Sequence, residues 1–361
     1  MSQSTATDQL FPRKISVPNP GGVEQTWSTS PRDGQYRFYT KRWYPTSAQD
    51  PSQEIRPKAT ILFLHGFVEY IDRYREIFTY FPNQGIEVVA FDQRGWGETC
   101  LANLKGKANY GNTTWPQQFQ DIQDILLQQR KRLDEKWGTT STTQDQPGRV
   151  EMFLVGQSMG GGLTCGFFTR PKEFPFQPSE EAKASIKGAI ALAPWLKLTE
   201  EPNPLLVWVG NNILAKIPGM PWSVKLDGEA LSRDPVVAQA MEKDPLCSKK
   251  VYLKAIQGPL KGGGEMVEKD YRNWRKGLPL LILHGTGDKV TSYKASVEMV
   301  EKLTGKAQTS SSGSKADVPV VIEEDCEVKL FEGFYHDLLG EPEDDKIKVA
   351  QSMVEWILKR V

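Results

Sequence analysis

Short apolar runs alternate with longer amphipathic segments along most of the chain. Each run has the length of a strand buried on both faces, and each amphipathic segment has the spacing of a helix with one apolar face. Alternating strands and helices favour a mostly parallel sheet covered by helices on both sides, an α/β fold. Strands are predicted at 59–64, 87–91, 150–155, 186–192, 280–284 and 328–331, with an earlier half-exposed strand at 35–43.

The stretch 194–270 interrupts this alternation. It has no strand signal, it is rich in proline and tryptophan, and its apolar residues recur at helical spacing. A connection between two core strands is usually far shorter than this. We therefore predict a mainly helical cap (lid) inserted into a core made of 23–193 and 271–361, preceded by an N-terminal arm at 1–22.

Charge composition limits the classes of partner. Lys and Arg together number 45, as do Asp and Glu, so the formal net charge is zero. Such a chain has no long-range field to attract nucleic acid or an anionic membrane. Nucleic acid is excluded as an expected partner, and any contact with lipid has to come from a local apolar surface.

The cysteines and the N-terminus favour a cytoplasmic location. Cys100, Cys165, Cys247 and Cys326 are far apart and form no CxxC pair, so neither a disulfide scaffold nor a structural zinc site is expected. The first residues lack the apolar stretch of a signal peptide, and no run approaches the ~20 apolar residues that span a bilayer. We expect a cytoplasmic protein, peripheral on lipid droplets or membranes.

The strongest chemical signal is the motif Gly156-Gln157-Ser158-Met159-Gly160, between an apolar run and a helical segment. A nucleophilic serine has to stand above the sheet on a sharp strand-to-helix turn, where glycines two residues away on either side avoid collisions. The turn also puts the serine at a helix N-terminus, which favours developing negative charge. Ser158 is therefore the predicted nucleophile. The alternative is a glycine-rich turn with an incidental serine.

A serine nucleophile needs a base to take its proton. Among the three histidines, His336 follows the last strand, at the carboxyl end where open α/β sheets build their sites. His336 is therefore the predicted base. His65 and His284 each end a strand and precede a glycine, so we predict packed histidines satisfied by backbone groups.

The third member should be a carboxylate that orients the base, in the chain order serine, acid, histidine. Asp288 lies one loop beyond a core strand and fits this order. The alternative for Asp288 is a solvated loop aspartate. Asp270 and Asp325 have less suitable settings, and Asp337 is too near His336 in sequence to approach it easily.

Acyl transfer also needs two N–H groups that receive the negative charge of the tetrahedral intermediate. One is predicted at Met159, the residue after the nucleophile. The other is predicted in the loop His65-Gly66-Phe67, where the glycine lets the backbone approach closely. The alternative for this loop is a tight strand exit without a catalytic role.

Together these motifs resemble the monoacylglycerol lipase branch of the α/β hydrolases, in consistent order from about residue 25 to the C-terminus. Two segments of the predicted cap, 231–235 and 244–247, also resemble that branch. The core segments that carry the resemblance are His65–Phe67 with Glu69, Arg73 and Tyr74, then Phe91–Gly97, the Ser158 turn, Gly287-Asp288 and Gly333–His336.

The resemblance implies an α/β-hydrolase fold and the hydrolysis of a monoacylglycerol to glycerol and a free fatty acid. It implies that Phe67 and Met159 supply the oxyanion N–H groups. Glu69 and Arg73 would lie towards the polar end of the site, and Cys247 near the acyl pocket. No metal or organic cofactor is expected.

Some positions depart from the family pattern. Val68 replaces a residue that is often small, and Gln157 stands where histidine is common, so the shape of the polar pocket is open. The polar loops 138–148 and 305–317 have no counterpart in the family core. In the cap, one apolar side is predicted to line an acyl-chain tunnel with a lip that contacts lipid, the alternative being packing onto the core. The tunnel residues are Leu206, Ile213, Leu214 and Ile217.

Other functions of the same fold stay open. A lysophospholipase or a general carboxylesterase would use the same three residues. A non-catalytic lipid-binding homologue is less expected, because Ser158, Asp288 and His336 are all present in the required order. Epoxide hydrolases and dehalogenases are disfavoured, since their chemistry places aspartate rather than serine at the turn.

Overall fold

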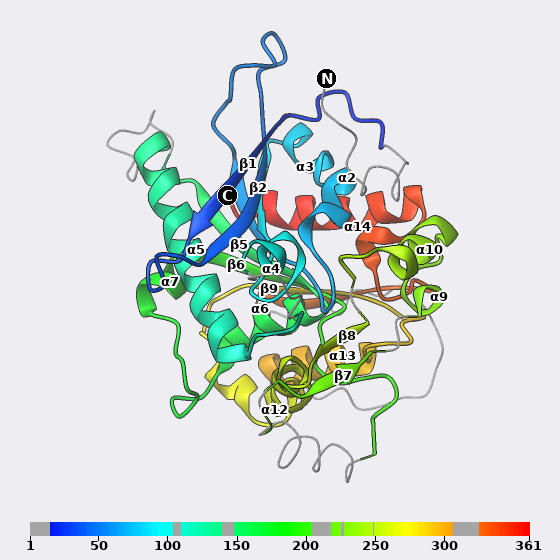
Figure 1. Ribbon diagram of the computed structural model, residues 1–361. Coiled ribbons are helices and arrows are strands. Elements are labelled where there is room, and N and C mark those ends of the chain that lie inside the picture. The colour runs from blue at the N-terminus through cyan, green and yellow to red at the C-terminus, as the bar shows by residue number, and fades with distance from the viewer. Residues whose placement is uncertain are drawn as a thin grey trace.

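A large mixed sheet forms the centre of the molecule (Figure 1). The computed structural model describes residues 15–103, 110–138, 148–203, 217, 219–224, 227–247, 249–305 and 325–361. Within these ranges, eight strands form the sheet in the order β1-β2-β4-β3-β5-β6-β9-β10. They are β1 (Gly22–Thr29), β2 (Arg37–Tyr44), β3 (Ala59–Leu64), β4 (Ile86–Phe91), β5 (Glu151–Gln157), β6 (Ile186–Leu192), β9 (Leu280–Gly285) and β10 (Cys326–Phe331). The pairs β1·β2 and β2·β4 are antiparallel, and the other neighbours are parallel.

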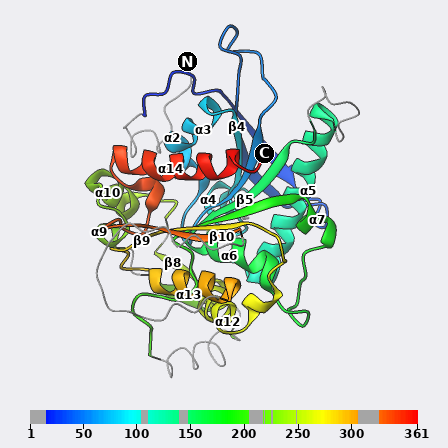
Figure 2. The ribbon, with the colours of Figure 1, turned by 180° about the vertical axis from the view of Figure 1, so that it is seen from behind.

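Helices cover both faces of the sheet, as Figures 1 and 2 show. One face carries α4 (Gly97–Ala102), α5 (Trp115–Trp137), α6 (Met159–Thr169), α7 (Glu180–Ala184), α12 (Gly263–Glu268) and α13 (Tyr293–Thr304). The other carries η1 (Ile71–Tyr74), α2 (Arg75–Phe78), α3 (Tyr80–Asn83), η5 (Leu338–Gly340) and α14 (Glu343–Leu358). Strand β3 is buried on both sides, with Leu62 and Leu64 in the first apolar core and Ile61 and Phe63 in the second. This confirms the predicted α/β architecture.

The described residues of the segment between β6 and β9 contribute no strand to the large sheet. The segment contains α9 (Gly228–Leu231), α10 (Pro235–Lys243), α11 (Lys254–Gln257), the π-helical turn η3 (Gly258–Gly262) and the 3₁₀ turn η4 (Asp270–Asn273). The prediction that it holds no strand is wrong, because β7 (Pro221–Ser223) pairs with β8 (Lys250–Tyr252). Strands of three residues are too short for an alternating pattern to stand out.

Strand β1 was also missed by the pattern. Its residues are mostly exposed and polar, with Trp27 and Val23 as its large apolar side chains. An edge strand of this kind is held by main-chain pairing along the whole length of β2 rather than by burial. Hydrophobic alternation is therefore a weak guide to it.

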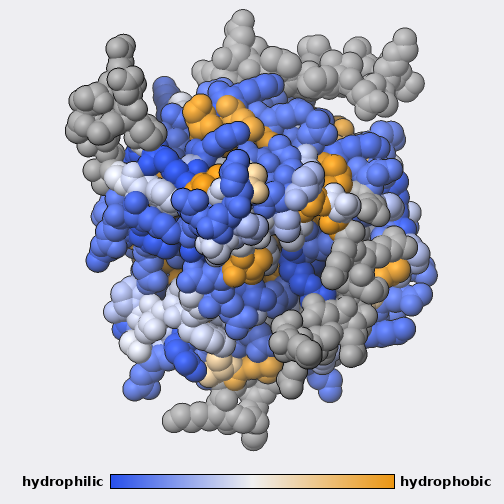
Figure 3. All heavy atoms as spheres, turned by 90° about the horizontal axis from the view of Figure 1, so that it is seen from above, coloured by the Kyte–Doolittle hydropathy of each residue, from blue (hydrophilic) through white to orange (hydrophobic). Residues whose placement is uncertain are grey.

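The visible surface is polar, and its apolar residues are scattered in small separate groups over the face seen in Figure 3. Within the described ranges, no helix combines the length and the apolar character needed to cross a membrane.

Candidate active site

A strained turn at Ser158 joins β5 to α6. Ser158 has φ 55° and ψ −115°, a left-handed conformation that non-glycine residues rarely adopt. A Cβ added to Gly156 would lie 2.2 Å from backbone atoms of Gly160, and one added to Gly160 would lie 2.1 Å from the Leu64 carbonyl oxygen. Glycine is therefore required at both positions. The turn is held by a hydrogen bond of 2.8 Å from the Ser158 N–H to the Leu192 carbonyl.

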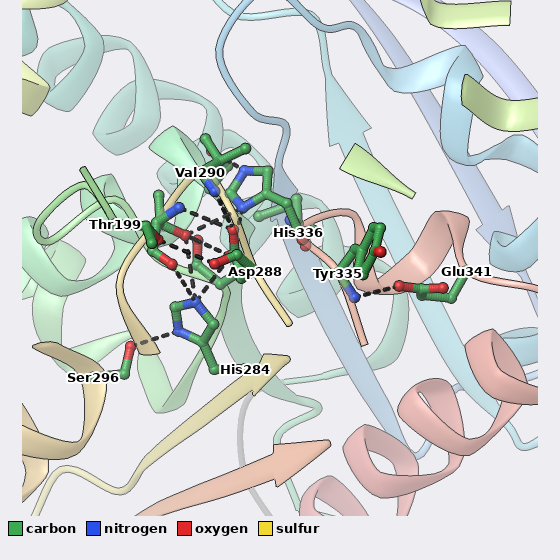
Figure 4. Close-up of polar contacts among 12 residues, drawn as sticks. Thr199, His284, Asp288, Val290, Ser296, Tyr335, His336 and Glu341 are labelled. Atoms are coloured by element: carbon green, nitrogen blue, oxygen red, sulfur yellow. Dashed lines mark hydrogen bonds and ion pairs between the residues drawn. The ribbon is translucent and has the colours of Figure 1, made fainter. Parts of the chain in front are cut away.

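Three predicted residues from distant segments meet above the carboxyl ends of the strands. The Oγ of Ser158 lies 2.8 Å from Nε2 of His336. The Nδ1 of His336 lies 2.8 Å from Oδ2 of Asp288, as Figure 4 shows. The Gln157 side chain donates to the His336 carbonyl at 2.7 Å and so holds the backbone of this histidine. The arrangement can pass a proton from the serine hydroxyl to an imidazole that a carboxylate orients.

The electrostatics of the pair favour a charged imidazole beside a charged carboxylate. Burial would raise the pKa of Asp288, but the charge of His336 and hydrogen bonds from His336 and His284 hold that pKa well below its ordinary value. Burial would lower the pKa of His336, yet the charge and the hydrogen bond of Asp288 raise it above 6.5. Both directions describe stabilisation of the imidazolium that forms when the base takes a proton.

Asp288 is fixed by further donors. Its Oδ1 accepts the N–H groups of Val290 and Thr291 at 2.7 and 2.9 Å, and its Oδ2 accepts the Thr291 hydroxyl at 2.8 Å. A ring nitrogen of His284 also lies 3.0 Å from Oδ2. The carboxylate is buried and cannot rotate without losing several of these bonds, so the loop after β9 presents it in one orientation.

The two remaining histidines differ from each other. His65 contacts the Gly66 carbonyl at 2.8 Å and the Gln93 N–H at 2.9 Å, so the prediction of a packed histidine satisfied by backbone is confirmed for it. His284 is also packed and lies 3.2 Å from the Thr291 carbonyl, but its closest contacts are the side chains of Ser296 and Asp288, so the prediction that backbone groups satisfy it is wrong. The sequence did not indicate the contact with Ser296, because Ser296 belongs to α13, one element further along the chain.

The loop after β3 passes directly beside the serine. A Cβ added to Gly66 would lie 3.2 Å from the Cβ of Ser158. Val68, one residue beyond the predicted donor Phe67, has φ 60°, which is rare for a β-branched residue. Met159 opens α6, where the first N–H groups of a helix have no partner within it. The assignment of Phe67 and Met159 as oxyanion donors stays a prediction.

A buried ion-pair network supports this loop. Glu69 accepts the Gly66 N–H at 2.9 Å, and it also accepts the hydroxyl of Tyr74. Arg73 lies 2.6 Å from Glu69 and 3.2 Å from Asp337. Burial would raise the pKa of Glu69, but the charge of Arg73 and the bond from Tyr74 lower it. The network joins the loop after β3 to the loop that carries the base.

A cavity of about 270 Å³ opens above the serine. Ser158, His336, Phe67 and Glu69 all line it. Its other apolar walls include Trp195, Leu231, Met241 and Ile256. Hollows of about 390 and 580 Å³ open elsewhere, but none of the three predicted catalytic residues lines either of them.

The other predicted substrate contacts are placed differently. Arg73 and Cys247 are buried and do not line the cavity. Ile217 is half-exposed and does not line it either. Leu206, Ile213 and Leu214 lie outside the described residues. The lining residues Trp195, Leu231, Met241 and Ile256 were not predicted, and of these only Leu231 stands in a segment that the resemblance had singled out.

The end of α9 and the residues that follow it hold the histidine loop in place. The Leu231 carbonyl accepts the N–H of Asp337 at 2.7 Å. Arg233 donates to Glu341 at 2.8 Å, and Glu341 accepts the N–H of Tyr335, as drawn in Figure 4. Leu231 also lines the cavity. The same short segment therefore touches the cavity and the loop that carries the base.

The family is decided by comparison with known proteins. The model of the family described as "Serine aminopeptidase, S33" matches residues 55–343, which is most of the chain. The chain belongs to this family. It is a hydrolase of the α/β-hydrolase fold, related to the monoacylglycerol lipase branch as its motifs had indicated.

Relatives and solved structures support this placement. A putative monoglyceride lipase of Schizosaccharomyces pombe is 28% identical over 322 residues, covering 89% of this chain and 71% of that protein. A monoacylglycerol lipase of Mycolicibacterium smegmatis is 25% identical over 305 residues, covering 84% and 90%. The crystal structure of a soluble variant of monoglyceride lipase from Saccharomyces cerevisiae, in complex with a substrate analogue, is similar in fold. Its TM-score is 0.72 at 20% identity, with 97% of this chain and 99% of that one covered.

Proposed function

We propose that the protein hydrolyses monoacylglycerols to glycerol and a free fatty acid. The observation that carries the proposal is the chain of contacts from Ser158 through His336 to Asp288, at 2.8 Å for each step, beneath a cavity with apolar walls. Relatives named monoglyceride or monoacylglycerol lipase point to the same substrate class.

The reaction follows from these contacts as two acyl transfers. The Ser158 oxygen bonds to the ester carbonyl carbon while its proton passes to Nε2 of His336. The carbonyl oxygen becomes negative and is received by N–H groups at Phe67 and Met159. The carbon–oxygen bond to glycerol then breaks, and His336 returns the proton to the departing oxygen. Water repeats the sequence on the acyl-enzyme, and the fatty acid leaves.

The cavity favours a neutral polar group over a phosphate. Glu69 and Asp227 contribute carboxylates to its lining, and no lysine or arginine lines it among the described residues. Because Glu69 is already paired with Arg73, the carboxylate of Asp227 makes the difference: it repels a phosphate and can accept hydrogen bonds from glycerol hydroxyls. This favours a monoacylglycerol over a lysophospholipid, although a Bacillus subtilis phospholipase is among the relatives, at 25% identity.

A substrate panel tests the proposal. We expect kcat/KM for a long-chain monoacylglycerol to exceed that for an anionic lysophosphatidylglycerol of the same acyl chain by about tenfold or more, because one unfavourable charge contact costs on the order of 1–2 kcal/mol. Free fatty acid is measured by mass spectrometry, with the Ser158→Ala variant as the blank. A preference for the lysophospholipid, or release of amine from an aminoacyl anilide without ester cleavage, would replace the proposal.

The pH dependence follows from the raised pKa of His336. The base acts only when its ring is neutral, and a raised pKa keeps the proton on to higher pH. Activity should therefore fall on the acid side with a midpoint above 6.5, the ordinary value for histidine. The measurement is kcat/KM from pH 5 to 9 with a neutral ester. A midpoint below that of free histidine would contradict the pairing with Asp288.

We also propose that the cap carries the contact with lipid. Trp222 of β7 lines the cavity and is 45% exposed, and Ile217, close by in the chain, is 49% exposed. Exposed large apolar side chains, one of them lining the cavity, are suited to partial insertion into a lipid surface.

Flotation with neutral liposomes checks this contact. We expect the double variant Ile217→Asp with Trp222→Asp to bind liposomes about tenfold more weakly than the wild type, because two apolar side chains that would insert into the lipid are replaced by charged ones. The matched control is Trp27→Asp, a tryptophan that is 38% exposed on β1. Equal recovery of the double variant and the wild type would rule out the cap as the lipid-binding face.

A further inference from the structure

The carboxylate of Asp288 is shared between two imidazole rings. Its Oδ2 lies 2.8 Å from Nδ1 of His336 and 3.0 Å from Nε2 of His284 (Figure 4). The transfer of a proton from Ser158 uses the first ring and leaves the second without a role. A histidine that is fully buried against the charged group of a catalytic candidate site calls for an explanation.

The surroundings of His284 fix its tautomer. Its Nε2 faces two acceptors, Oδ2 of Asp288 and the Thr291 carbonyl at 3.2 Å, so this nitrogen carries a hydrogen. Its Nδ1 lies 2.8 Å from the Ser296 hydroxyl, which can donate to it. Ser296 is buried in the first turn of α13. The side chains of Ser296, His284, Asp288, His336 and Ser158 thus form one continuous line of hydrogen-bond contacts.

We propose that His284 is a positioning residue that holds Asp288 towards His336 and sets how strongly His336 binds its proton. The proposal rests on the proposed function only in taking His336 as the base. The Nε2–H of His284 competes with the Nδ1–H of His336 for the same oxygen, Oδ2 of Asp288. A carboxylate that accepts a further hydrogen bond is a weaker partner for an imidazolium. The shared oxygen therefore moderates the basicity of His336 while the bond fixes the direction of the carboxylate.

Loss of the His284 donor should have two consequences: turnover falls, and the pKa of His336 rises. The Asp288 carboxylate keeps its bonds from the loop after β9 but loses the N–H that lies on the side of α13, so its position relaxes and turnover falls. At the same time its full charge acts on His336, so the proton is held more firmly and the pKa of His336 rises. A residue that only supported folding would lower stability without moving this pKa.

The other charged groups that face His336 stay in place in such a variant. Glu69 from the loop after β3 and Asp337 from the histidine loop both raise the pKa of His336 by their charge. Arg73 pairs with both of them. Glu69, Arg73 and Asp337 form their own ion-pair network, whereas His284 contacts Asp288 directly, so a change in titration after its replacement is assigned to Asp288.

The experiment compares His284→Phe, which keeps the ring volume without a donor, with His284→Gln, whose amide can restore one. Ring titration by NMR reads the pKa of His336 directly, in the absence of substrate. We expect this pKa to rise by about 0.5 unit in the Phe variant and to return towards the wild-type value in the Gln variant. In steady-state assays kcat should fall about tenfold to a hundredfold in the Phe variant with KM nearly unchanged.

Met299→Ala is the matched control. Met299 is buried on α13, one turn beyond Ser296, so its loss destabilises the same helix without touching the carboxylate. It should lower Tm and leave the pKa of His336 where it is. If the Phe variant does not fold, Ser296→Ala removes the donor to Nδ1 and should shift the pKa in the same direction by less. An unchanged pKa in the folded Phe variant, or in Ser296→Ala in its place, overturns the proposal, as does an equal shift in Met299→Ala.

The failure of this proposal is distinguishable from failure of the proposed function. The NMR titration needs no turnover, so it reports on His284 even if the substrate is not a monoacylglycerol. If the protein cleaved no ester, kcat could not be assayed, but the NMR titration of His336 would still test the role of His284.

Discussion

Replacement of Ser158 by alanine is expected to lower kcat for a monoacylglycerol by roughly five to six orders of magnitude, the size of effect seen when a serine nucleophile is removed. The physical reason is that the hydroxyl supplies the atom that bonds to the acyl group. The Thr291 hydroxyl also contacts His336, but it lies 3.1 Å from Nδ1, the nitrogen that faces Asp288, and Thr291 does not line the cavity. The backbone bonds of the turn, to Leu192 and from Trp195, do not involve this hydroxyl. Alanine should therefore keep the fold.

The check combines single-turnover kinetics with a thermal melt of both proteins. The two Tm values should agree within about 2 °C, since the mutation removes one nearly buried hydroxyl and keeps the strained backbone as it was. A variant that retains turnover within about tenfold of the wild type, with a normal melt, would remove Ser158 from the mechanism.

Asp288→Asn is expected to lower kcat by about 10⁴-fold, because an amide can donate to Nδ1 of His336 and select the wrong tautomer for accepting the serine proton. The lost negative charge should also lower the pKa of His336, so the acid limb of the pH profile moves down. Asp337→Asn is the matched control, since Asp337 contacts Arg73 rather than the ring of the base. It should reduce kcat far less than Asp288→Asn does.

The same variant should also change how the free energy of unfolding depends on pH. The pKa of Asp288 is depressed in the folded protein, so its contribution to stability is present above the unfolded pKa and is lost as pH falls through the folded value. The loss of unfolding free energy between about pH 4 and pH 2 should therefore be smaller in Asp288→Asn than in the wild type, because this range lies below the ordinary aspartate value and below the titration of free histidine. A steeper loss in the variant would contradict the direction of this shift.

The core of the fold could be predicted from the sequence because the local patterns of residues agree with the overall arrangement of strands and helices. Strand β6 lies at the predicted 186–192, and β5 leads directly into the Ser158 turn as the glycine spacing required. The order of Ser158, Asp288 and His336 along the chain was sufficient to name three side chains that the structure brings into contact. Each strand and each motif around these three residues is a run of consecutive residues, and their order can be read along the chain.

Features that depend on contacts between residues far apart in the sequence could not be predicted. The contact of His284 with Ser296 and the hold of Arg233 on Glu341 join segments that share no local pattern. The exposed strand β1 is set by pairing rather than by burial. The cavity walls come from several elements, so Trp195 and Met241 gave no signal that set them apart from ordinary core residues.

Covalent labelling of the intact protein by a fluorophosphonate tests the central claim most directly. Such a probe reacts only with a serine whose proton is removed by an adjacent base. We predict a single adduct, located by peptide mass spectrometry at Ser158, that is lost in Ser158→Ala and strongly slowed in Asp288→Asn. An unlabelled protein, or an adduct on another serine with Ser158 untouched, would contradict the account.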